Sequence, residues 1–293
     1  MRRGSLAALC AGLILATPVP AEPVRVGVRA DARPFVHLDD AGNHAGFLYD
    51  LCVAAVEGTG REAVLVEVEA DDRFSLLEPS EDQIDLLCDP TTITVERAGV
   101  FDFTPIVFIA NATFLRKRDR AHLTGAQAAD AGCAVPPGSK GVAAGWLRGS
   151  TSAGAMEAAR RWGVIRLRDD EVICPVEVEL HAAGIARVCD PEGDLSFYFG
   201  DGDILAAHVE DFEGDGGCQA GFGTGFLTYE PYAFAVTGRL PGFRRELQQA
   251  LYGVFRSAVV AESYAAHFGG RTPPDTLEKL FLMYRIPQGA PVE

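Results

Sequence analysis

The sequence predicts an α/β fold, and two observations carry this prediction. Some segments show apolar residues that alternate with polar ones, as in half-buried strands, and others show apolar residues at helical spacing. Segments of these two kinds follow each other along the chain. The chain has 293 residues, about twice the length of an average domain, so we expect two domains or a single large one. Because strands that alternate with helices build parallel sheets, the order of these segments favours α/β units.

The first part of the chain supplies one such α/β unit. Val24, Val26 and Val28 alternate with polar residues as a strand does, and a helix stopped by Gly58 and Gly60 follows. We expect strands at 24–28, 63–68 and 84–88, helices at 47–56 and 73–77, and an extended apolar segment at 101–114 that Pro105 interrupts.

A second unit begins after this extended segment. Gly149, Ser150 and Thr151 precede an Ala-rich helix, where Ser and Thr are typical N-caps and exposed backbone N–H groups can receive an anion. The later segments are expected as strands at 176–180 and 195–199, an acidic loop at 210–217, a strand from 232 and a long amphipathic helix at 243–258.

The composition excludes several classes of protein. Hydrophobic residues make up 48% and charged residues 23% of the chain, which is typical of a globular protein and not of a disordered chain or a coiled coil. The formal net charge of −15 repels the phosphates of nucleic acids and the heads of anionic lipids. We therefore expect no nucleic-acid partner, and an anionic ligand would need a few well-placed arginines.

The N-terminus has the pattern of a secretory signal peptide. Arg2 and Arg3 precede an apolar stretch at 6–16, and small residues stand before a cleavage site after Ala21. The apolar stretch is shorter than the about 20 helical residues that span a bilayer. We expect residues 1–21 to be removed and the mature protein to reside in the periplasm.

Six cysteines remain after the signal peptide, and an even number in an exported protein indicates disulfides. Because no two of them form a CxxC pair, zinc and thioredoxin chemistry are not indicated. The sequence alone does not select the pairing, and some of the cysteines could be small buried hydrophobes.

A series of short motifs runs through about residues 24–269, which is nearly all of the mature chain. They are Pro34-Phe35, Gly46-Phe47 with Asp50-Leu51, Asp85-Leu86, the stretch from Thr92 to Arg97, the stretch from Phe101 to Pro105, Gly149-Ser150-Thr151, and Phe199-Gly200-Asp201 before Ile204-Leu205. In residues and in order, this series resembles the bacterial extracellular solute-binding proteins of family 3, the polar amino-acid receptors of ABC importers.

The resemblance implies a two-lobed periplasmic binding protein clamshell of type II, with parallel or mixed sheets and a hinge of two crossings. Lobe one would hold residues 22–110 and 230–293, and lobe two residues 111–229. The ligand would bind between the lobes and close them, and a membrane permease would receive it. In this architecture Cys52 and Cys88 lie on two elements of one lobe that pack together, so we expect them to be bonded.

The same resemblance places five ligand-binding residues, whose chemistry suits a free amino acid. Arg97 would hold the ligand carboxylate bidentately, with donors from Thr92, Ser150 and Thr151. Asp201, at the end of a strand in lobe two, would accept the ammonium group. Each residue also has a structural reading. Arg97 could be a surface residue near a helix start, the hydroxyl residues could be caps or strand positions, and Asp201 could be a turn residue, with Asp203 as its competitor.

Two departures from the family's pattern bear on the ligand. Ala32 stands where many members carry an aromatic residue, so the pocket would lack one wall. Arg29 stands five positions before Pro34, as in glutamate and aspartate receptors, and together with Arg73 it would recognise an acidic side chain. The structural alternative is that Arg29 only solvates a strand end or pairs with Asp31.

We expect a monomeric receptor with no catalytic residue, no cofactor and no metal. His181 has no second His or Cys at ligand spacing, so it reads as a solvated cap or an interlobe residue. Two alternatives stay open. One is an exported dehydratase of the same fold that acts on a cyclic carboxylic acid. The other is a ligand sensor that reports to a separate membrane protein.

Overall fold

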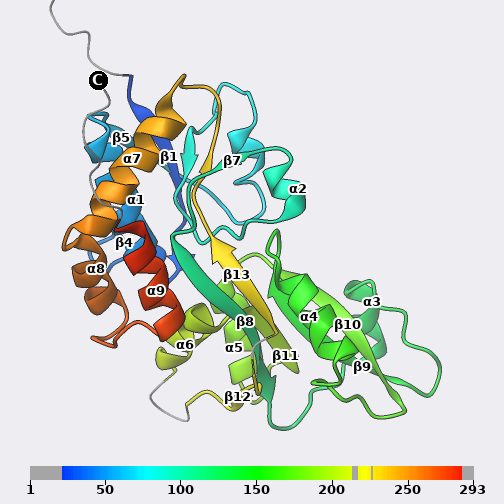
Figure 1. Ribbon diagram of the computed structural model, residues 1–293. Coiled ribbons are helices and arrows are strands. Elements are labelled where there is room, and N and C mark those ends of the chain that lie inside the picture. Colours follow the sequence, from blue (N-terminus) through cyan, green and yellow to red (C-terminus); the bar gives the residue numbers. More distant parts are fainter. Residues whose placement is uncertain (1–21, 213–216, 226, 286–293) are drawn as a thin grey trace, which may run out of the picture.

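The computed structural model describes residues 22–212, 217–225 and 227–285, which form two lobes joined by a pair of long strands (Figure 1). The expected signal peptide at 1–21 lies outside the described residues, as do residues 213–216 of the expected acidic loop. Within the described ranges, no helix combines the length and the apolar character that crossing a membrane requires.

The sheet of lobe one combines parallel and antiparallel pairs. The strand order is β5 (Ala63–Glu67), β1 (Val24–Val28), β6 (Leu86–Leu87), β14 (Ala235–Val236) and β7 (Asp102–Phe103). β1 runs parallel to β5 and β6, whereas β14, which comes from a much later part of the chain, is antiparallel to β6 and β7. A small antiparallel sheet, which follows β1 in the sequence, consists of β2 (Asp31–Ala32), β3 (Val36–Leu38) and β4 (His44–Ala45).

Helices enclose the core of lobe one. α1 (Phe47–Gly58) packs against α7 (Phe243–Arg256) and α8 (Val259–His267), as Figure 1 shows in its upper lobe. The buried face of α7 follows the helical spacing seen in the sequence, and the helix ends two residues before the expected position 258. The lobe is completed by η1 (Ser75–Leu77), α2 (Val95–Ala98) and α9 (Asp275–Tyr284).

Lobe two has a sheet of its own with helices on both sides of it. β9 is parallel to β10 and β11, and β8 is antiparallel to β11, β12 and β13. The strands are β10 (Glu171–Val178), β9 (Lys140–Leu147), β11 (Phe197–Asp201), β8 (Phe108–Lys117), β12 (Ala220–Phe222) and β13 (Thr228–Tyr232). The helices are α3 (Gly125–Asp130), α4 (Ser152–Arg161), α5 (His181–Cys189) and α6 (Gly202–Glu210).

The strand expected at 176–180 lies earlier in the chain, because β10 begins at Glu171 and ends at Val178. Pro175, which cannot donate a ladder hydrogen bond, is accommodated because β10 is an edge strand. The start of the strand is fixed by the buried Glu171 carboxylate, which pairs with Arg120 and His122. Polar side chains, and not apolar alternation, therefore set this boundary.

The chain passes between the lobes along β8 and β13, which pair antiparallel from Phe108 opposite Tyr232 to Ala112 opposite Thr228. Figure 1 shows these two strands running diagonally from the upper to the lower lobe. Two adjacent strands with a continuous register form a narrow connection, so a change in their twist would move one lobe against the other.

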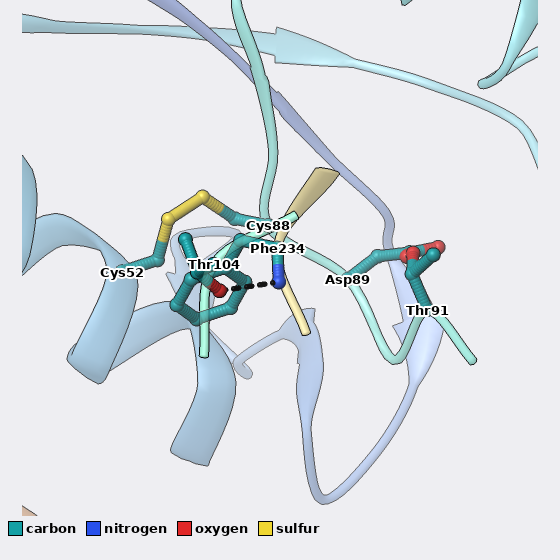
Figure 2. Close-up of a disulfide and its surroundings, with 6 residues drawn as sticks. All are labelled: Cys52, Cys88, Asp89, Thr91, Thr104 and Phe234. Atoms are coloured by element: carbon teal, nitrogen blue, oxygen red, sulfur yellow. Dashed lines mark hydrogen bonds between the residues drawn. A yellow bond between two sulfur atoms is a disulfide. The ribbon is translucent and has the colours of Figure 1, made fainter. Parts of the chain in front are cut away.

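Each lobe contains disulfides. Cys52 on α1 is bonded to Cys88 at the end of β6, with their Cα atoms 6.0 Å apart, as expected from the family resemblance. Figure 2 shows this bond and, just beyond Cys88, the side chains of Asp89 and Thr91. The bond therefore anchors the strand end that leads to Asp89. The remaining described cysteines form Cys133–Cys174 and Cys189–Cys218.

Candidate functional site

A small pocket lies between the two lobes, against the crossing strands. Its cavity volume is about 40 Å³, which is much smaller than the roughly 300 to 1,000 Å³ of pockets that hold small ligands. The lobes are therefore closed on each other. All seven residues expected to bind ligand line this pocket: Arg29, Arg73, Thr92, Arg97, Ser150, Thr151 and Asp201.

Two of the three arginines in the pocket are almost fully buried around one carboxylate. Arg29 and Arg73 are 3% and 2% exposed, and Asp89 between them is 0% exposed. Arg73 Nε lies 3.1 Å from Asp89 Oδ2, and Arg29 Nη1 lies 3.8 Å from the same oxygen. Burial lowers the pKa of Arg73 to about 10, although the charge of Asp89 acts in the opposite direction.

These two guanidinium groups retain unused donors. Within the described part of the chain, Arg73 Nη1 and Arg29 Nε are buried and have no hydrogen-bond partner. A buried N–H group without an acceptor is costly, and both side chains line the pocket. Asp89 Oδ2, which lies near both arginines, is likewise buried without a hydrogen-bond partner, so the site holds unpaired donors around an unpaired acceptor.

Arg97 joins the lobes. From the end of α2 in lobe one, its Nη1 donates to the carbonyl of Thr92 at 2.9 Å and its Nη2 to the carbonyl of Gly149 in lobe two at 3.0 Å. Arg73 Nη2 donates to the same Gly149 carbonyl at 3.2 Å. The guanidinium of Arg97 also lies 4.4 Å from the centre of the Phe74 ring, which holds its plane in position.

The hydroxyl groups in the pocket are already engaged. Thr151 occupies the N-cap position of α4, but its side chain makes no cap hydrogen bond and donates to Glu230 Oε2 at 2.8 Å. Thr92 donates to the same oxygen at 2.7 Å. Ser150 Oγ donates to the carbonyl of Leu147 at 2.6 Å. We expected these hydroxyl groups to donate to a ligand carboxylate, but in the structure they already donate to acceptors within the protein.

Asp201 is the N-cap of α6. Its Oδ1 accepts from the backbone N–H groups of Asp203 and Ile204, and its Oδ2 accepts from the hydroxyl of Tyr232 at 2.9 Å. Burial, with a contribution from the charge of Asp203, raises the pKa of Asp201 to about 8. Asp203, the competing carboxylate, does not line this pocket.

The pairing of Arg29 with Asp31, which the sequence left open, is present in the structure. Asp31 Oδ2 also accepts from the backbone N–H of His181 in lobe two at 3.3 Å. His181 is buried, so it is an interlobe residue and not a solvated cap, and burial lowers its pKa to about 3. Ala32 lies in the core of lobe one and does not line the pocket.

Three pocket-region residues were not found by sequence reasoning: Asp89, Glu230 and Tyr232. Glu230 could have been identified as a candidate site residue from the sequence, because it is an acidic residue in a short segment that we expect to cross between the lobes. It shares a strand face with Tyr232, two positions on, and both are buried. Asp89 directly follows Cys88, and only the fold shows that it meets two arginines.

The arrangement combines hydrogen-bond donors and acceptors on both lobes, which suits a small charged or zwitterionic molecule. In the described ranges, no group of three or more His, Cys, Asp or Glu side chains is placed to hold a metal ion. The chemistry offered at this pocket is therefore that of arginine, carboxylate, hydroxyl and backbone groups.

A family model described as bacterial extracellular solute-binding proteins, family 3, matches residues 24–270 of the chain. No curated protein matches the sequence. Several solved structures share the fold. An ancestral arginine-binding protein bound to glutamine superimposes with a TM-score of 0.65 at 21% identity, with 85% of this chain and 98% of that chain covered.

Two further structures have the same fold but differ in description. An ancestral amino-acid-binding protein, a precursor of cyclohexadienyl dehydratase, gives a TM-score of 0.61 at 22% identity over 84% of this chain and 95% of that chain. The ligand-binding core of GluR0 from Nostoc punctiforme, in complex with L-glutamate, gives 0.60 at 20% identity over 84% of this chain and 99% of that chain.

Proposed function

Because the chain belongs to family 3 of the bacterial extracellular solute-binding proteins, we propose that it captures a polar amino acid in its interlobe pocket and delivers it to the membrane permease of an ABC importer. It would act as a monomer in the periplasm after removal of residues 1–21. Lobe one, at 22–110 and 230–293, would close on lobe two, at 111–229, when the ligand binds.

One observation carries the proposal. The pocket between the lobes contains three arginines, and the buried Arg73 Nη1 has no hydrogen-bond partner in the described part of the chain. An anionic group of a ligand would complete this donor set. Because ligand contacts come from both lobes, binding energy would hold the closed form.

The proposed placement of the ligand follows the charges. Arg97 would hold the α-carboxylate together with the backbone N–H groups at the start of α4, where the helix dipole favours an anion. Ser150 and Thr151 frame this helix start. The ammonium group would lie on the acidic side of the pocket, near Asp201 and Thr92.

We further propose that the ligand is an acidic amino acid, glutamate or aspartate, with its side-chain carboxylate near Arg29 and Arg73. The free donors of both arginines support this assignment. Asp31 and Asp89 already offset part of their charge, so the preference for an acid over its amide rests mainly on hydrogen bonding. An amide side chain would offer one carbonyl acceptor where a carboxylate offers two oxygens.

The test is isothermal titration calorimetry of the mature protein against the common amino acids. We expect glutamate or aspartate to bind more tightly than glutamine or asparagine, and Arg29→Ala to narrow that difference. Arg29→Gln serves as the milder variant, and Arg256→Ala, on the exposed end of α7, serves as the control. Tighter binding of a neutral or basic amino acid would overturn the acidic assignment, and no binding of any amino acid would overturn the receptor function.

The dehydratase alternative has one observation in its favour. Burial raises the pKa of the Asp201 carboxyl group, which favours its protonated form, and a protonated carboxyl group can act as a general acid. It would donate its proton to the ring hydroxyl group, which departs as water, while the C–C bond to the ring carboxylate breaks and releases carbon dioxide, so that the electrons of that bond complete the aromatic ring. Incubation with a cyclohexadienyl carboxylic acid, followed by ultraviolet absorbance of the aromatic product, tests this role. Turnover that Asp201→Asn abolishes would favour the enzyme.

A further inference from the structure

Glu230 lies in the wall of the pocket, on the crossing strand β13. It is 6% exposed and lines the interlobe pocket. Its Oε2 accepts hydrogen bonds from Thr92 of lobe one and Thr151 of lobe two, and its Oε1 accepts from Thr228 on its own strand. A single carboxylate thus gathers hydroxyl groups from both lobes and from the connection between them.

Counting hydrogens shows what these contacts do to the two threonines of the pocket. A threonine hydroxyl has one hydrogen to donate and two lone pairs that can accept. Thr92 and Thr151 both give their hydrogen to Glu230, and their oxygens lie 3.4 Å apart. Towards a ligand, each hydroxyl can therefore act only as an acceptor.

The negative charge of the pocket points to the same residue. Asp31 and Asp89 are engaged with Arg29 and Arg73. Asp201 uses its oxygens for the start of α6 and for Tyr232. The hydrogen bonds of Glu230 go to hydroxyl groups, and among the described residues it forms no ion pair with an arginine, although the charge of Arg97 lies within electrostatic range of it. A ligand cation in the closed pocket would meet a carboxylate that no arginine contacts directly.

We propose that Glu230 determines specificity for an amino group: it takes the hydroxyl hydrogens of Thr92 and Thr151 and so presents two oxygen acceptors and a negative charge to the ligand's ammonium. This inference rests on the proposed function and changes the roles within it. Thr92 and Thr151 become acceptors for the ammonium, and the ligand carboxylate is left to Arg97 and the backbone N–H groups of α4.

The proposal makes the amino group a requirement for binding. A ligand without it would leave two acceptor oxygens and a carboxylate without a donor in a closed pocket, which is costly. We expect the deamino analogue of any ligand to bind at least about a hundredfold more weakly than the amino acid itself. This selectivity would exclude simple dicarboxylates, which otherwise satisfy the same arginines.

Glu230→Gln tests the inference because it keeps the size of the side chain. Its amide nitrogen would donate to one of the threonines, which reverses that hydroxyl, and the charge is lost. The probes are three pairs of an amino acid and its deamino analogue: L-glutamate with glutarate, L-glutamine with glutaramate, and L-arginine with guanidinovalerate. Calorimetry gives the affinity of each probe for wild type, Glu230→Gln, Asp201→Asn and the control Glu57→Gln on the exposed surface of α1.

In Glu230→Gln, we expect the affinity for the amino acid to fall about thirtyfold or more while the affinity for its analogue stays near that of wild type. The ratio between the two would therefore shrink. Asp201→Asn is expected to reduce this ratio less, and Glu57→Gln to leave it unchanged. Thermal melting of each variant shows that it is folded.

Two results would overturn the inference while the receptor function stands. One is that Glu230→Gln has the same ratio of affinities for the amino acid and for its deamino analogue as wild type. The other is tighter binding of both probes by this variant, which would mean that Glu230 competes with the ligand carboxylate for the threonine hydroxyls. If no amino acid binds to the wild type, the proposed function fails and this inference fails with it.

Discussion

Arg97→Ala should abolish ligand binding and leave the fold intact. The guanidinium has five N–H groups, of which one is given to the Thr92 carbonyl and one to the Gly149 carbonyl. The remaining donors are sufficient for a bidentate contact with a carboxylate. Hydrogen bonds to a charged group contribute roughly 1.5 to 3 kcal/mol each. Two of them amount to about 3 to 6 kcal/mol, or a loss of affinity of more than about a hundredfold.

The assay compares wild type, Arg97→Ala and Arg97→Lys by calorimetry with the amino acid that wild type binds most tightly. Arg97→Lys should also bind poorly, because a single ammonium cannot reproduce the planar fork of donors. Arg97 is only half-buried, so its truncation should change the melting temperature little. Affinity of Arg97→Ala within about threefold of wild type, on the scale where 1.4 kcal/mol is tenfold, would refute this role.

Three further predictions concern closure and stability. Replacing Cys52 and Cys88 by serine, which opens a link between residues 36 positions apart, should lower the free energy of unfolding in urea by about 3 to 4 kcal/mol. Gly149→Ala should weaken ligand binding about tenfold or more, because the φ angle of Gly149 is +72° and an added Cβ would lie 2.7 Å from the carbonyl oxygen of Ala70 in lobe one. The control is Gly154→Ala, whose added Cβ has no atom within 4 Å, and this variant should bind as wild type does. Burial alone would raise the pKa of Glu171, but its hydrogen-bond donors and arginine partner lower it to about 2, so its carboxylate stabilises the fold above about pH 4.5 and this contribution is lost as the pH falls towards 2. Between these two pH values, the melting temperature of Glu171→Gln should therefore fall less than that of wild type. Equal falls in melting temperature would contradict this role of Glu171.

The order of the elements could be predicted from the sequence because it depends on local patterns, whereas the positions of the arginines were expected from the resemblance to the family's motifs. The alternation of Val24, Val26 and Val28 gives β1, and the spacing from Phe243 gives α7. Motif order then brings Arg97 and Asp201 to one pocket, although they lie far apart in the chain. Boundaries set by buried polar contacts, as at Glu171, have no such signal.

The partners of each site residue could not be predicted, because they depend on contacts between distant segments. The threonine at 151 has the sequence signature of a helix cap, yet its hydroxyl turns to Glu230, 79 positions later in the chain. Asp201 is likewise both a pocket residue and the cap of α6. Local sequence identifies a residue that can play a role, whereas the packing of the lobes decides which role it plays.

Each of the three disulfides of the described residues lies within a single lobe. Cys52–Cys88 lies within lobe one, whereas Cys133–Cys174 and Cys189–Cys218 lie within lobe two, and none of these bonds bridges the two lobes. A protease must wait for a local opening of the chain before it can cleave, and a crosslink within a lobe makes such openings rarer. Crosslinks placed in this way therefore oppose local opening within each lobe and do not tie one lobe to the other.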